Sequence, residues 1–353
     1  HPVAATCPTI ERRIVVISHV SDTLLTAVDA EMRAVLDEVP LDESGFGVIL
    51  RYPLGWVTAE GEPYAMPAGK RVRPLLLLLC AQAAGQNWKM ALPAAAAVEL
   101  LHNFSLIHDD IEDNSPMRHG RPTVWKLWGV ANAINAGDAM FTLAFMAVQR
   151  LTAAGAAPSV SLRALDLFSR TALMLTRGQH LDMGFENRRS ITVLQYLEMI
   201  GGKTAALLGL SAELGALISS GDADRAAHFR QFGRDLGVAF QIHDDILGIW
   251  GDEQQTGKSA ASDILSRKKS LPILFGLERS ARLREIYSQP TSAPIDVSEV
   301  VGLLNQVDAQ SFARDLEQRH SEQSASALVE ADPAPEAADR LRSMIDTLFV
   351  RSS

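Results

Sequence analysis

"IHDDI" occupies residues 107–111 and recurs at residues 242–246, both times within an apolar stretch. The first copy continues as IHDDIEDNSPMRHGRPT and the second as IHDDILGIWGDEQQTGKS. Residues four apart on an α-helix share a face, so Asp109 and Asp113 lie one turn apart, whereas the second copy has Gly248 at that spacing. Two carboxylates so placed repel each other. Hard divalent cations relieve this repulsion because they prefer oxygen ligands.

The chemistry expected of this motif depends on its occurring twice. A single Asp-Asp motif is more often a solvated helix end, or a cap of the next element, than a metal site. Two copies with the same flanking residues favour two facing helices that hold a shared cluster of Mg²⁺ ions, with Gln241, Asp244 and Asp245 contributed by the second copy. Because Mg²⁺ combines a couple of carboxylates with water and substrate phosphates, the motif predicts a phosphate-bearing ligand.

The composition indicates one large helical domain. The chain has 353 residues, 47% of them hydrophobic and 6% aromatic, which is enough apolar material for a large core. Length alone suggests two domains or more, but no Gly-, Ser- or Pro-rich linker divides residues 20–320. Long Ala- and Leu-rich stretches repeat apolar positions every three or four residues, without strict alternation. We therefore expect an all-α domain at 20–353, no sheet, and an N-terminal extension or tag remnant at 1–19.

Charge and cysteine content argue against several functional classes. A net charge of −9 disfavours nucleic acid as a partner, and any anionic substrate would need locally placed cations. Cys7 and Cys80 cannot build a disulfide framework, which indicates a reducing cytoplasm. The longest apolar run, PLLLLLCAQAAG, is too short to span a bilayer, and the sequence shows no plausible signal peptide. We therefore expect a cytoplasmic protein.

Basic residues lie near both acidic motifs in the sequence. AGKRVRP forms a Pro- and Gly-bounded turn before an apolar helix, a setting suited to a diphosphate. MRHGRP follows the first motif, GGKTAALLG has a lysine behind a flexible Gly pair, and TGKSAASDILSRKKSLP follows the second motif. Each of these lysines alone is better explained as a solvated surface residue, but together they indicate a metal–diphosphate site. The residues concerned are Lys70, Arg71, Arg73, Arg118, His119, Lys203, Thr204, Lys258, Lys268 and Lys269.

These motifs resemble those of the trans-isoprenyl diphosphate synthases, also called polyprenyl synthetases. The resemblance covers roughly residues 20–350 and rests on GKRVRP, ELLHNFSLIHDDIED, RHGRPT, GQHLD, GGKTAALL, FQIHDDILG and GKSAASDILSRKKSLP, in the family's order. It implies an isoprenoid synthase-type helical bundle around a deep central cavity, and a homodimer. It also implies a prenyltransferase that condenses an allylic diphosphate (dimethylallyl, geranyl or farnesyl) with isopentenyl diphosphate.

The resemblance assigns roles to individual residues. Two Mg²⁺ ions would be bound by Asp109 and Asp113 and a third by Asp244, with Mn²⁺ as a substitute. Support for these ligands, without contact to the metal, would come from Asp110 and Asp245. The allylic diphosphate would be held by Arg118, Lys203 and Lys258, with Gln241, Lys268 and Thr204 nearby. The diphosphate of isopentenyl diphosphate would be held by Lys70, Arg73 and His102, with Arg71 beside them. The developing carbocation would lie close to Gln179 and Asp182.

The reaction implied by the family follows from charge. The metal ions and cations stabilise the departing diphosphate, which is the dominant electrostatic contribution. The allylic cation, held in a dry apolar cavity, is attacked by the double bond of isopentenyl diphosphate. The released diphosphate takes the final proton, so no dedicated general base is required.

The sequence departs from the family's pattern at four positions. His119 stands where a second arginine is frequent, and it is a weaker, pH-dependent cation. Gly248 replaces the third carboxylate of the second motif, Ala261 stands where glycine is common, and Ala68 replaces the first glycine of Gly-Gly-Lys-Arg. Because Gly248 lies one turn from Asp244, we expect Gly248→Asp to be tolerated and to strengthen metal binding.

Product length is expected to depend on residues just before the first motif. Ser105 lies one turn below Asp109 on the same face, about 6 Å away, and Phe104 flanks it. In the family an aromatic at this depth acts as a floor for the growing chain. The single aromatic Phe104, the small Ser105 and the absence of an insertion in DDIED resemble the geranylgeranyl (C20) pattern, whereas two adjacent aromatics would indicate farnesyl (C15). That Phe104 is only a core residue stays open.

Two other functions also stay open. His119 and Gly248 leave room for a terpene cyclase-like lyase on the same fold, which uses the metals but not isopentenyl diphosphate. A non-catalytic subunit of a heteromeric synthase is disfavoured, because the first acidic motif is complete. His108 and His243 each precede an aspartate and point off its face, so we interpret them as packing or hydrogen-bonding residues rather than metal ligands.

Overall fold

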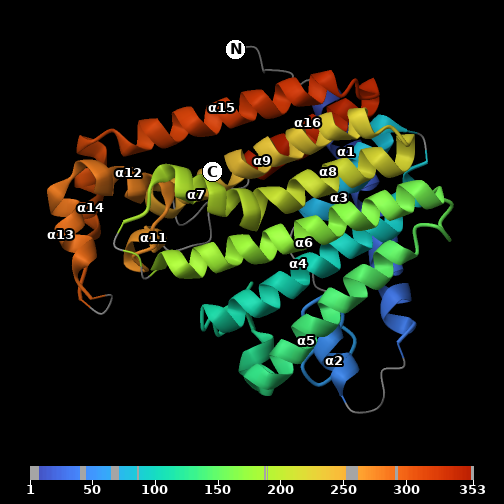
Figure 1. Ribbon diagram of the computed structural model, residues 1–353, viewed down its shortest axis with the longest axis horizontal. Coiled ribbons are helices and arrows are strands. Elements are labelled where there is room, and N and C mark those ends of the chain that lie inside the picture. Colours follow the sequence, from blue (N-terminus) through green and yellow to red (C-terminus); the bar gives the residue numbers. More distant parts are fainter. Residues whose placement is uncertain are drawn as a thin grey trace, which may run out of the picture. The chain divides into compact units, whose positions relative to one another are not determined.

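The computed structural model is almost entirely helical, so the predicted all-α class is confirmed (Figure 1). It describes residues 8–39, 45–64, 71–85, 87–186, 188, 190–251, 261–290 and 293–350, with side chains from residue 21 onward except at 186 and 350. Two predicted substrate ligands, Lys70 and Lys258, lie outside the described residues, as does Ala68.

The chain forms two compact units, and the prediction of one domain at 20–353 stays a prediction. Unit 1 comprises His1–Asp166, Leu214–Asp222 and Ala334–Arg340. Unit 2 comprises Leu167–Glu213, Ala223–Pro333 and Leu341–Ser353. Three helices contribute residues to both units: α6 (Pro158–Glu186), α8 (Ala206–Ser220) and α16 (Pro335–Val350).

Unit 1 is built around α4, whose buried face packs chiefly against α5 and α1. Buried alanines and leucines of α3 and α4 form its core, since side chains without branching at Cβ suit helices and small ones allow close packing. Helix α1 begins at Pro8 and so crosses the boundary expected between residues 19 and 20. The elements are α1 (Pro8–Asp37), α2 (Phe46–Arg51), α3 (Val72–Ala84), η1 (Trp88–Ala91), α4 (Leu92–Glu112), β1 (Met117–Arg118), β2 (Arg121–Pro122) and α5 (Val124–Gln149).

Local sequence sets both ends of α4. Pro93 lies in its first turn, where a missing N–H costs nothing, and a run of alanines follows. After Glu112 the chain leaves the helix through Asn114, whose φ of 51° is the left-handed conformation that often ends helices. Pro116 then prevents the helix from resuming. The acidic motif is thereby placed on the last turn.

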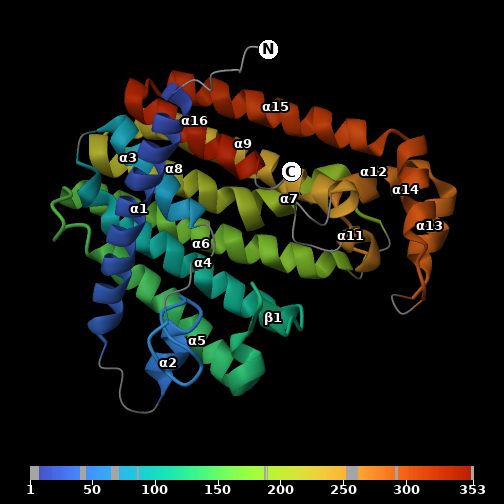
Figure 2. The ribbon, with the colours of Figure 1, turned by 180° about the vertical axis from the view of Figure 1, so that it is seen from behind.

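A two-residue hairpin follows α4 (Figure 2), so the expectation that no strands would form is wrong for this segment. β1 pairs antiparallel with β2, with Arg118 opposite Arg121. Between them, His119 and Gly120 have φ values of 49° and 74°. Two consecutive positive φ values are what a tight type I′ hairpin turn requires, and glycine adopts them without strain.

Unit 2 is organised by α9 and α15, which run side by side (Figures 1 and 2). Its core gathers apolar residues of α7, α9, α12 and α15, among them Ile200, Ile242, Ile246 and Leu274. The remaining elements are α7 (Val193–Ile200), η2 (Gly201–Ala205), α9 (Ala223–Trp250), α11 (Ser262–Leu265), α12 (Leu271–Arg279), α13 (Ala281–Ser288), α14 (Val297–Gln306) and α15 (Ala309–Glu330).

The element η2 is a π-helical turn between α7 and α8. A Cβ on Gly178 of α6 would lie 2.3 Å from the backbone nitrogen of Lys203, and one on Gly237 of α9 would lie 2.6 Å from the Cα of Ala205. Only glycine at these two positions lets α6 and α9 approach the turn so closely. π-helical turns are frequent at functional sites, and this one contains the predicted ligands Lys203 and Thr204.

One described segment, Trp88–Glu112, is long and apolar enough to cross a membrane by length and composition. Of its most apolar window, 67% is buried inside the protein. This burial is the pattern of a core helix.

Candidate active site

The first acidic motif forms the last turn of α4 in unit 1. The backbone N–H of Asp113 donates to the carbonyl oxygen of Asp109 at 2.8 Å, so the two lie one turn apart, as their spacing predicted. Asp109 is half-buried and Asp113 is exposed. Two carboxylate groups thus stand at a helix end that solvent can reach.

Asp110 lies on the inner side of this turn and is only 5% exposed. The Nε of Arg118, on β1, donates to its Oδ1 at 2.9 Å. Burial raises the pKa of Asp110, the charge and hydrogen bond of Arg118 offset part of that rise, and the charge of Asp113 adds to it. The hairpin therefore returns a cation to the acidic helix end, while His119 is exposed at its tip.

A second basic group of unit 1 lies between α3 and α4. A terminal guanidinium nitrogen of Arg73 is 3.1 Å from Nε2 of His102. Burial lowers the pKa of His102 well below its ordinary 6.5, and the charge of Arg73 lowers it further. His102 is therefore neutral and accepts the hydrogen bond. Burial raises the pKa of the adjacent Glu99, while the charges of Arg71 and Arg73 lower it.

Arg71 is bound to a carboxylate of α1. Its guanidinium donates to Oδ1 of Asp29 at 2.7 Å, and the indole N–H of Trp56 donates to the same oxygen at 2.8 Å. Burial would raise the pKa of Asp29, but the hydrogen bonds from Arg71 and Trp56 outweigh it, so the pKa is lowered. The side chain of Arg71 is 12% exposed. Its substrate contact stays a prediction, while its internal partner is Asp29.

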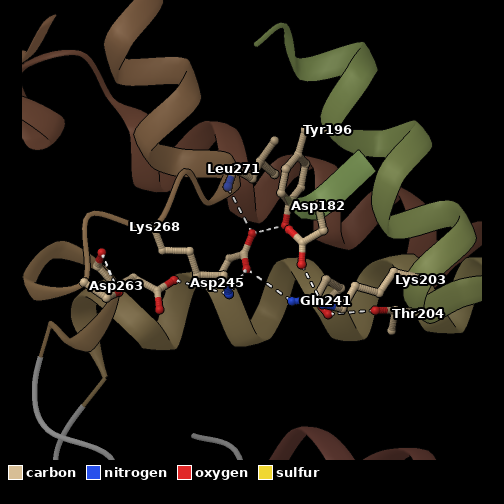
Figure 3. Close-up of polar contacts among 10 residues, drawn as sticks. Asp182, Tyr196, Lys203, Thr204, Gln241, Asp245, Asp263, Lys268 and Leu271 are labelled. Carbon is tan, nitrogen blue, oxygen red and sulfur yellow. Dashed lines mark hydrogen bonds and ion pairs between the residues drawn. The ribbon is translucent and has the colours of Figure 1, made fainter. Parts of the chain in front are cut away.

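In unit 2, the second aspartate of the second motif is enclosed by donors (Figure 3). Asp245 of α9 is 0% exposed. Its Oδ2 accepts hydrogen bonds from the hydroxyl of Tyr196 and from the backbone N–H of Leu271, the latter at 3.0 Å. Its Oδ1 accepts one from Nε2 of Gln241 at 3.2 Å and lies 3.7 Å from Nζ of Lys268. Several separate segments thus fix one carboxylate.

Lys268 carries a persistent positive charge beside this carboxylate. Desolvation lowers its pKa, but the negative charges of Asp245, Asp263, Asp244 and Asp182 together raise it above the ordinary 10.5. Nζ lies 3.8 Å from Oδ2 of Asp263, and 46% of the side chain is exposed. An anion arriving from solvent can therefore meet this ammonium group.

The predicted ligands on the π-helical turn are paired with their neighbours (Figure 3). Nζ of Lys203 donates to Oδ2 of Asp182 on α6 at 2.5 Å. The hydroxyl of Thr204 donates to Oε1 of Gln241 at 3.0 Å, and Gln241 in turn donates to Asp245. The predicted residues that this unit connects directly are Asp182, Lys203, Thr204, Gln241, Asp245 and Lys268. Half-buried Asp244 and Gln179 belong to the same helices, α9 and α6.

Gly248 lies against the carboxylate of Asp263. A Cβ at Gly248 would lie 2.6–2.8 Å from the carboxylate atoms of Asp263, a residue of the following helix α11. Gly248 is buried, and Asp263 is 13% exposed. A side chain at Gly248 would have to displace that carboxylate, which argues against the expectation that Gly248→Asp is tolerated and strengthens metal binding; the variant below tests it.

The residues expected to set product length lie in an aromatic contact between α4 and α5. The ring of Phe104 meets that of Phe141 edge-on, with centroids 5.0 Å apart. The ring of Phe141 also contacts that of Phe145, with centroids 5.1 Å apart. The hydroxyl of Ser105 donates to the carbonyl oxygen of His102 at 2.8 Å, so it is satisfied within its own helix. Phe104 is thus one member of an aromatic row.

The two histidines of the repeated motif contact neighbouring helices. A Cβ on Gly137 of α5 would lie 2.1 Å from Nε2 of His108, so α5 carries glycine where this ring packs. Nδ1 of His243 is 2.8 Å from a carboxylate oxygen of Glu317 on α15. These contacts agree with the interpretation of both histidines as packing or hydrogen-bonding residues.

The available oxygen ligands fit Mg²⁺. Within the described ranges, no three His, Cys, Asp or Glu side chains gather into a ready-made metal site. Mg²⁺ takes one or two carboxylates and completes its shell with water and substrate phosphates. Asp109 with Asp113, and Asp244 on the other motif, offer ligands of that kind. A metal–diphosphate complex therefore suits these residues better than a permanently bound ion.

Sequence reasoning missed Tyr196, Glu99 and Asp29. Glu99 did carry a signal, because a lone acid in the apolar run AVELLH must find a buried partner. Tyr196 and Asp29 carried none, since their partners lie 49 and 42 residues away in the sequence.

We predict that Asp29→Asn lowers the free energy of unfolding by about 1–3 kcal/mol at pH 7, because it removes the charged acceptor of two buried donors. The folded pKa of Asp29 lies below its ordinary 3.8, so this stabilisation is present above pH 3.8 and is lost as the pH falls through the folded pKa. Urea denaturation at several pH values measures it. Asp37→Asn is the control, because the side chain of Asp37 is 70% exposed; equal effects of both changes would contradict the assigned role.

We predict that Gly248→Asp destabilises the protein by about 1–3 kcal/mol through overpacking against the carboxylate of Asp263. Mg²⁺ affinity should not rise, since the new carboxylate meets another acid rather than the metal ligands. Thermal melts and a Mg²⁺ titration of activity measure the two effects. Gly302→Asp on α14 is the control, since a Cβ there meets nothing within 4 Å. Tighter Mg²⁺ binding by Gly248→Asp would refute this placement.

Solved structures share the fold along nearly the whole chain. The crystal structure of a polyprenyl synthetase from Streptomyces coelicolor A3(2) superposes with a TM-score of 0.85 at 34% identity, covering 93% of this chain and 98% of that one. The geranylgeranyl pyrophosphate synthetase from Pyrococcus horikoshii Ot3 gives 0.83 at 31% identity, covering 96% and 99%.

Curated sequences point to the same group. A (2E,6E)-farnesyl diphosphate synthase of Mycobacterium tuberculosis H37Rv is 44% identical over 227 residues, which are 64% of this chain and 62% of that protein. The chain thus spans less than two thirds of the length of this relative. A geranylgeranyl diphosphate synthase of the same strain is 41% identical over 245 residues, 68% of this chain and 69% of that protein. Residues 56–304 match the family model described as polyprenyl synthetase. The chain therefore belongs to the polyprenyl synthetase family.

Proposed function

We propose that this protein is a Mg²⁺-dependent prenyltransferase that joins an allylic diphosphate to isopentenyl diphosphate and yields a longer trans-polyprenyl diphosphate. The observation that carries the proposal is the same pairing in both IHDDI copies. In each, a buried aspartate holds a basic side chain beside a more accessible aspartate, as Asp110 does with Arg118 and Asp245 with Lys268. Carboxylates for metal next to cations for phosphate are what a metal–diphosphate complex requires.

The metal ligands we propose are Asp109 and Asp113 for two Mg²⁺ ions and Asp244 for a third. When bound, Mg²⁺ supplies Lewis-acid stabilisation of the charge on the departing diphosphate. Asp110 and Asp245 stay off the metal, because their buried oxygens are engaged by Arg118, Tyr196 and other donors.

The chain's own cations divide between the two substrates. The allylic diphosphate is held by Arg118, Lys203, Lys258 and Lys268, with Gln241 and Thr204 as polar partners. The diphosphate of isopentenyl diphosphate is held by Lys70 and Arg73. The neutral His102 orients Arg73 through its hydrogen bond. Asp182 keeps Lys203 in place. Asp182 and Gln179, which precedes it by about one turn of α6, lie beside the reacting carbons.

The reaction needs only charge stabilisation and exclusion of water from these groups. The C–O bond of the allylic diphosphate breaks and its electron pair leaves with the diphosphate, whose negative charge Arg118, Lys203 and Lys268 stabilise. The double bond of isopentenyl diphosphate then forms the new C–C bond with the allylic cation. A proton passes from the resulting cation to the released diphosphate, which restores a double bond.

We further propose that the main product is the C20 diphosphate. Relatives named for farnesyl and for geranylgeranyl products are similarly close, so identity alone does not separate C15 from C20. The supporting feature is local: one aromatic, Phe104, stands next to the small Ser105, and Phe141 of α5 braces it. The floor is therefore a pair of rings from two helices rather than one side chain.

We also propose a homodimer that works in the cytoplasm. For the homodimer, support comes from exposed apolar side chains near the start of α5, namely Leu127, Val130 and Ile134, which are 38%, 46% and 43% exposed in the single chain. Val130 and Ile134 lie one turn apart on the helix that continues after the kink at Gly129, and Leu127 lies just before that kink. Such exposed apolar side chains mark an interaction surface.

One assay tests the reaction. Purified protein with Mg²⁺ and each allylic diphosphate, with and without isopentenyl diphosphate, should yield elongated diphosphates only when both substrates are present. Hydrocarbons or alcohols without isopentenyl diphosphate would identify a terpene cyclase-like lyase instead. No product under either condition would indicate a non-catalytic subunit.

We predict that Asp109→Ala and Asp113→Ala each lower turnover by about 100-fold or more, the scale on which loss of transition-state charge stabilisation acts. Thermal stability should stay unchanged or rise, because the charge of Asp113 already disfavours ionisation of the buried Asp110. Steady-state rates and melting curves measure both effects. Glu112→Ala is the control on the same turn. Near-native turnover of either aspartate variant in Mg²⁺ would disprove the metal assignment.

We predict that Phe104→Ala lengthens the main product beyond C20, and that Ser105→Phe shortens it towards C15. Each isoprene unit extends the chain by roughly one helical turn, about 5 Å, so a ring removed or added one turn below Asp109 changes the product by whole units. Chromatography of dephosphorylated products measures this. Phe312→Ala is the control, because that ring stacks on Phe275 in unit 2. Unchanged product lengths in both test variants would place the floor elsewhere.

A further inference from the structure

Tyr196 of α7 is among the largest fully buried side chains of the protein, at 1% exposure. Its hydroxyl donates to Oδ2 of Asp245, 49 residues further along the chain (Figure 3). Burial, followed by the charge of Asp245, raises the pKa of Tyr196 well above 10, so the phenol keeps its proton. The hydroxyl is therefore a permanent donor to this carboxylate.

The two oxygens of Asp245 have different partners. Oδ2 faces the protein interior, where it receives Tyr196 and the backbone N–H of Leu271. Oδ1 faces Gln241 and Lys268, at 3.2 Å and 3.7 Å. Occupying Oδ2 fixes the plane of the carboxylate, and a fixed plane keeps Oδ1 directed at the two side chains assigned to the allylic diphosphate.

Lys268 depends on this arrangement more than Gln241 does. Gln241 is also held by the hydroxyl of Thr204 at 3.0 Å. Lys268, by contrast, has a side chain that is 46% exposed, and its carboxylate contacts are 3.7 Å to Asp245 and 3.8 Å to Asp263. A long, half-exposed lysine loses its direction readily, because its rotamer entropy opposes a single position.

We propose that Tyr196 is a positioning residue for the allylic diphosphate: its hydroxyl orients Asp245, and Asp245 orients Lys268 and Gln241. The inference rests on the proposed function and deepens it, because it names a residue that affects the binding of the allylic diphosphate and not that of isopentenyl diphosphate. Tyr196 touches neither substrate. Its influence reaches only the cations of unit 2 and leaves Arg73 and the isopentenyl diphosphate site unaffected.

The experiment compares Tyr196→Phe with the wild-type chain. Steady-state rates give kcat and a KM for each substrate at saturating concentration of the other, and calorimetry gives the affinity for inorganic diphosphate in Mg²⁺. Removing one hydrogen bond to a charged group should raise KM for the allylic diphosphate about tenfold and weaken inorganic diphosphate binding similarly. KM for isopentenyl diphosphate should not change.

Tyr287→Phe is the matched control. Its hydroxyl is buried and has no hydrogen-bond partner among the described residues, so its removal should leave both KM values and the melting temperature unchanged or raise the latter. Asp245→Asn is a second test variant, which keeps the side-chain shape and should reproduce the selective rise in allylic KM. It decides the matter if Tyr196→Phe fails to fold.

Three results would overturn the inference. These are wild-type constants in Tyr196→Phe, a lower kcat with both KM values unchanged, and an equal rise in both KM values. The second pattern is that of a merely structural residue that reduces the fraction of active protein. If the wild-type chain forms no elongated product, the proposed function fails separately. The affinities of the tyrosine variants for inorganic diphosphate then still decide the role of Tyr196.

Discussion

Keeping an ionised carboxylate inside the protein is the constraint on which both acidic motifs depend. A buried charge costs several kcal/mol unless donors surround it. Asp245 meets this requirement with Tyr196, Leu271, Gln241 and Lys268. Asp110 meets it chiefly with Arg118. The need to neutralise each inner aspartate therefore brings a basic side chain to a helix face that would otherwise carry acidic groups alone.

The repeated pentapeptide can then be understood as two adjacent carboxylates with opposite surroundings. Consecutive residues on a helix point about 100° apart, so one aspartate faces the interior and its neighbour faces the accessible side. The preceding histidine contacts another helix, as His108 does at Gly137 of α5 and His243 at Glu317 of α15. Five residues thus combine a histidine that packs on another helix, a buried aspartate that binds a basic side chain and an accessible aspartate proposed as a metal ligand, and all five are identical in the two copies.

Sequence patterns predicted what depends on local spacing and missed what depends on distant partners. The helical class and the shared turn of Asp109 and Asp113 follow from helix geometry, whereas the supporting role of Asp110 and Asp245 came from the family resemblance. The anchoring of Arg71 by Asp29 and of Asp245 by Tyr196 does not, because tertiary packing chooses partners more than 40 residues apart. Gly248 illustrates the same limit. Spacing alone gave it a metal-facing position, but a carboxylate from another segment occupies that space.

The π-helical turn at Gly201–Ala205 acts as a phase shift in an otherwise continuous helix. One π-helical turn accommodates one extra residue, which shifts the phase of the sequence that follows by about 100° relative to a regular helix. The apolar stripe of α7 and the polar pair Lys203 and Thr204 can therefore face different surroundings within two turns. Deleting a single residue from GGKTA would remove that offset and restore regular helical geometry, so α7 and α8 would keep their faces and the change would be confined to the turn that carries Lys203 and Thr204.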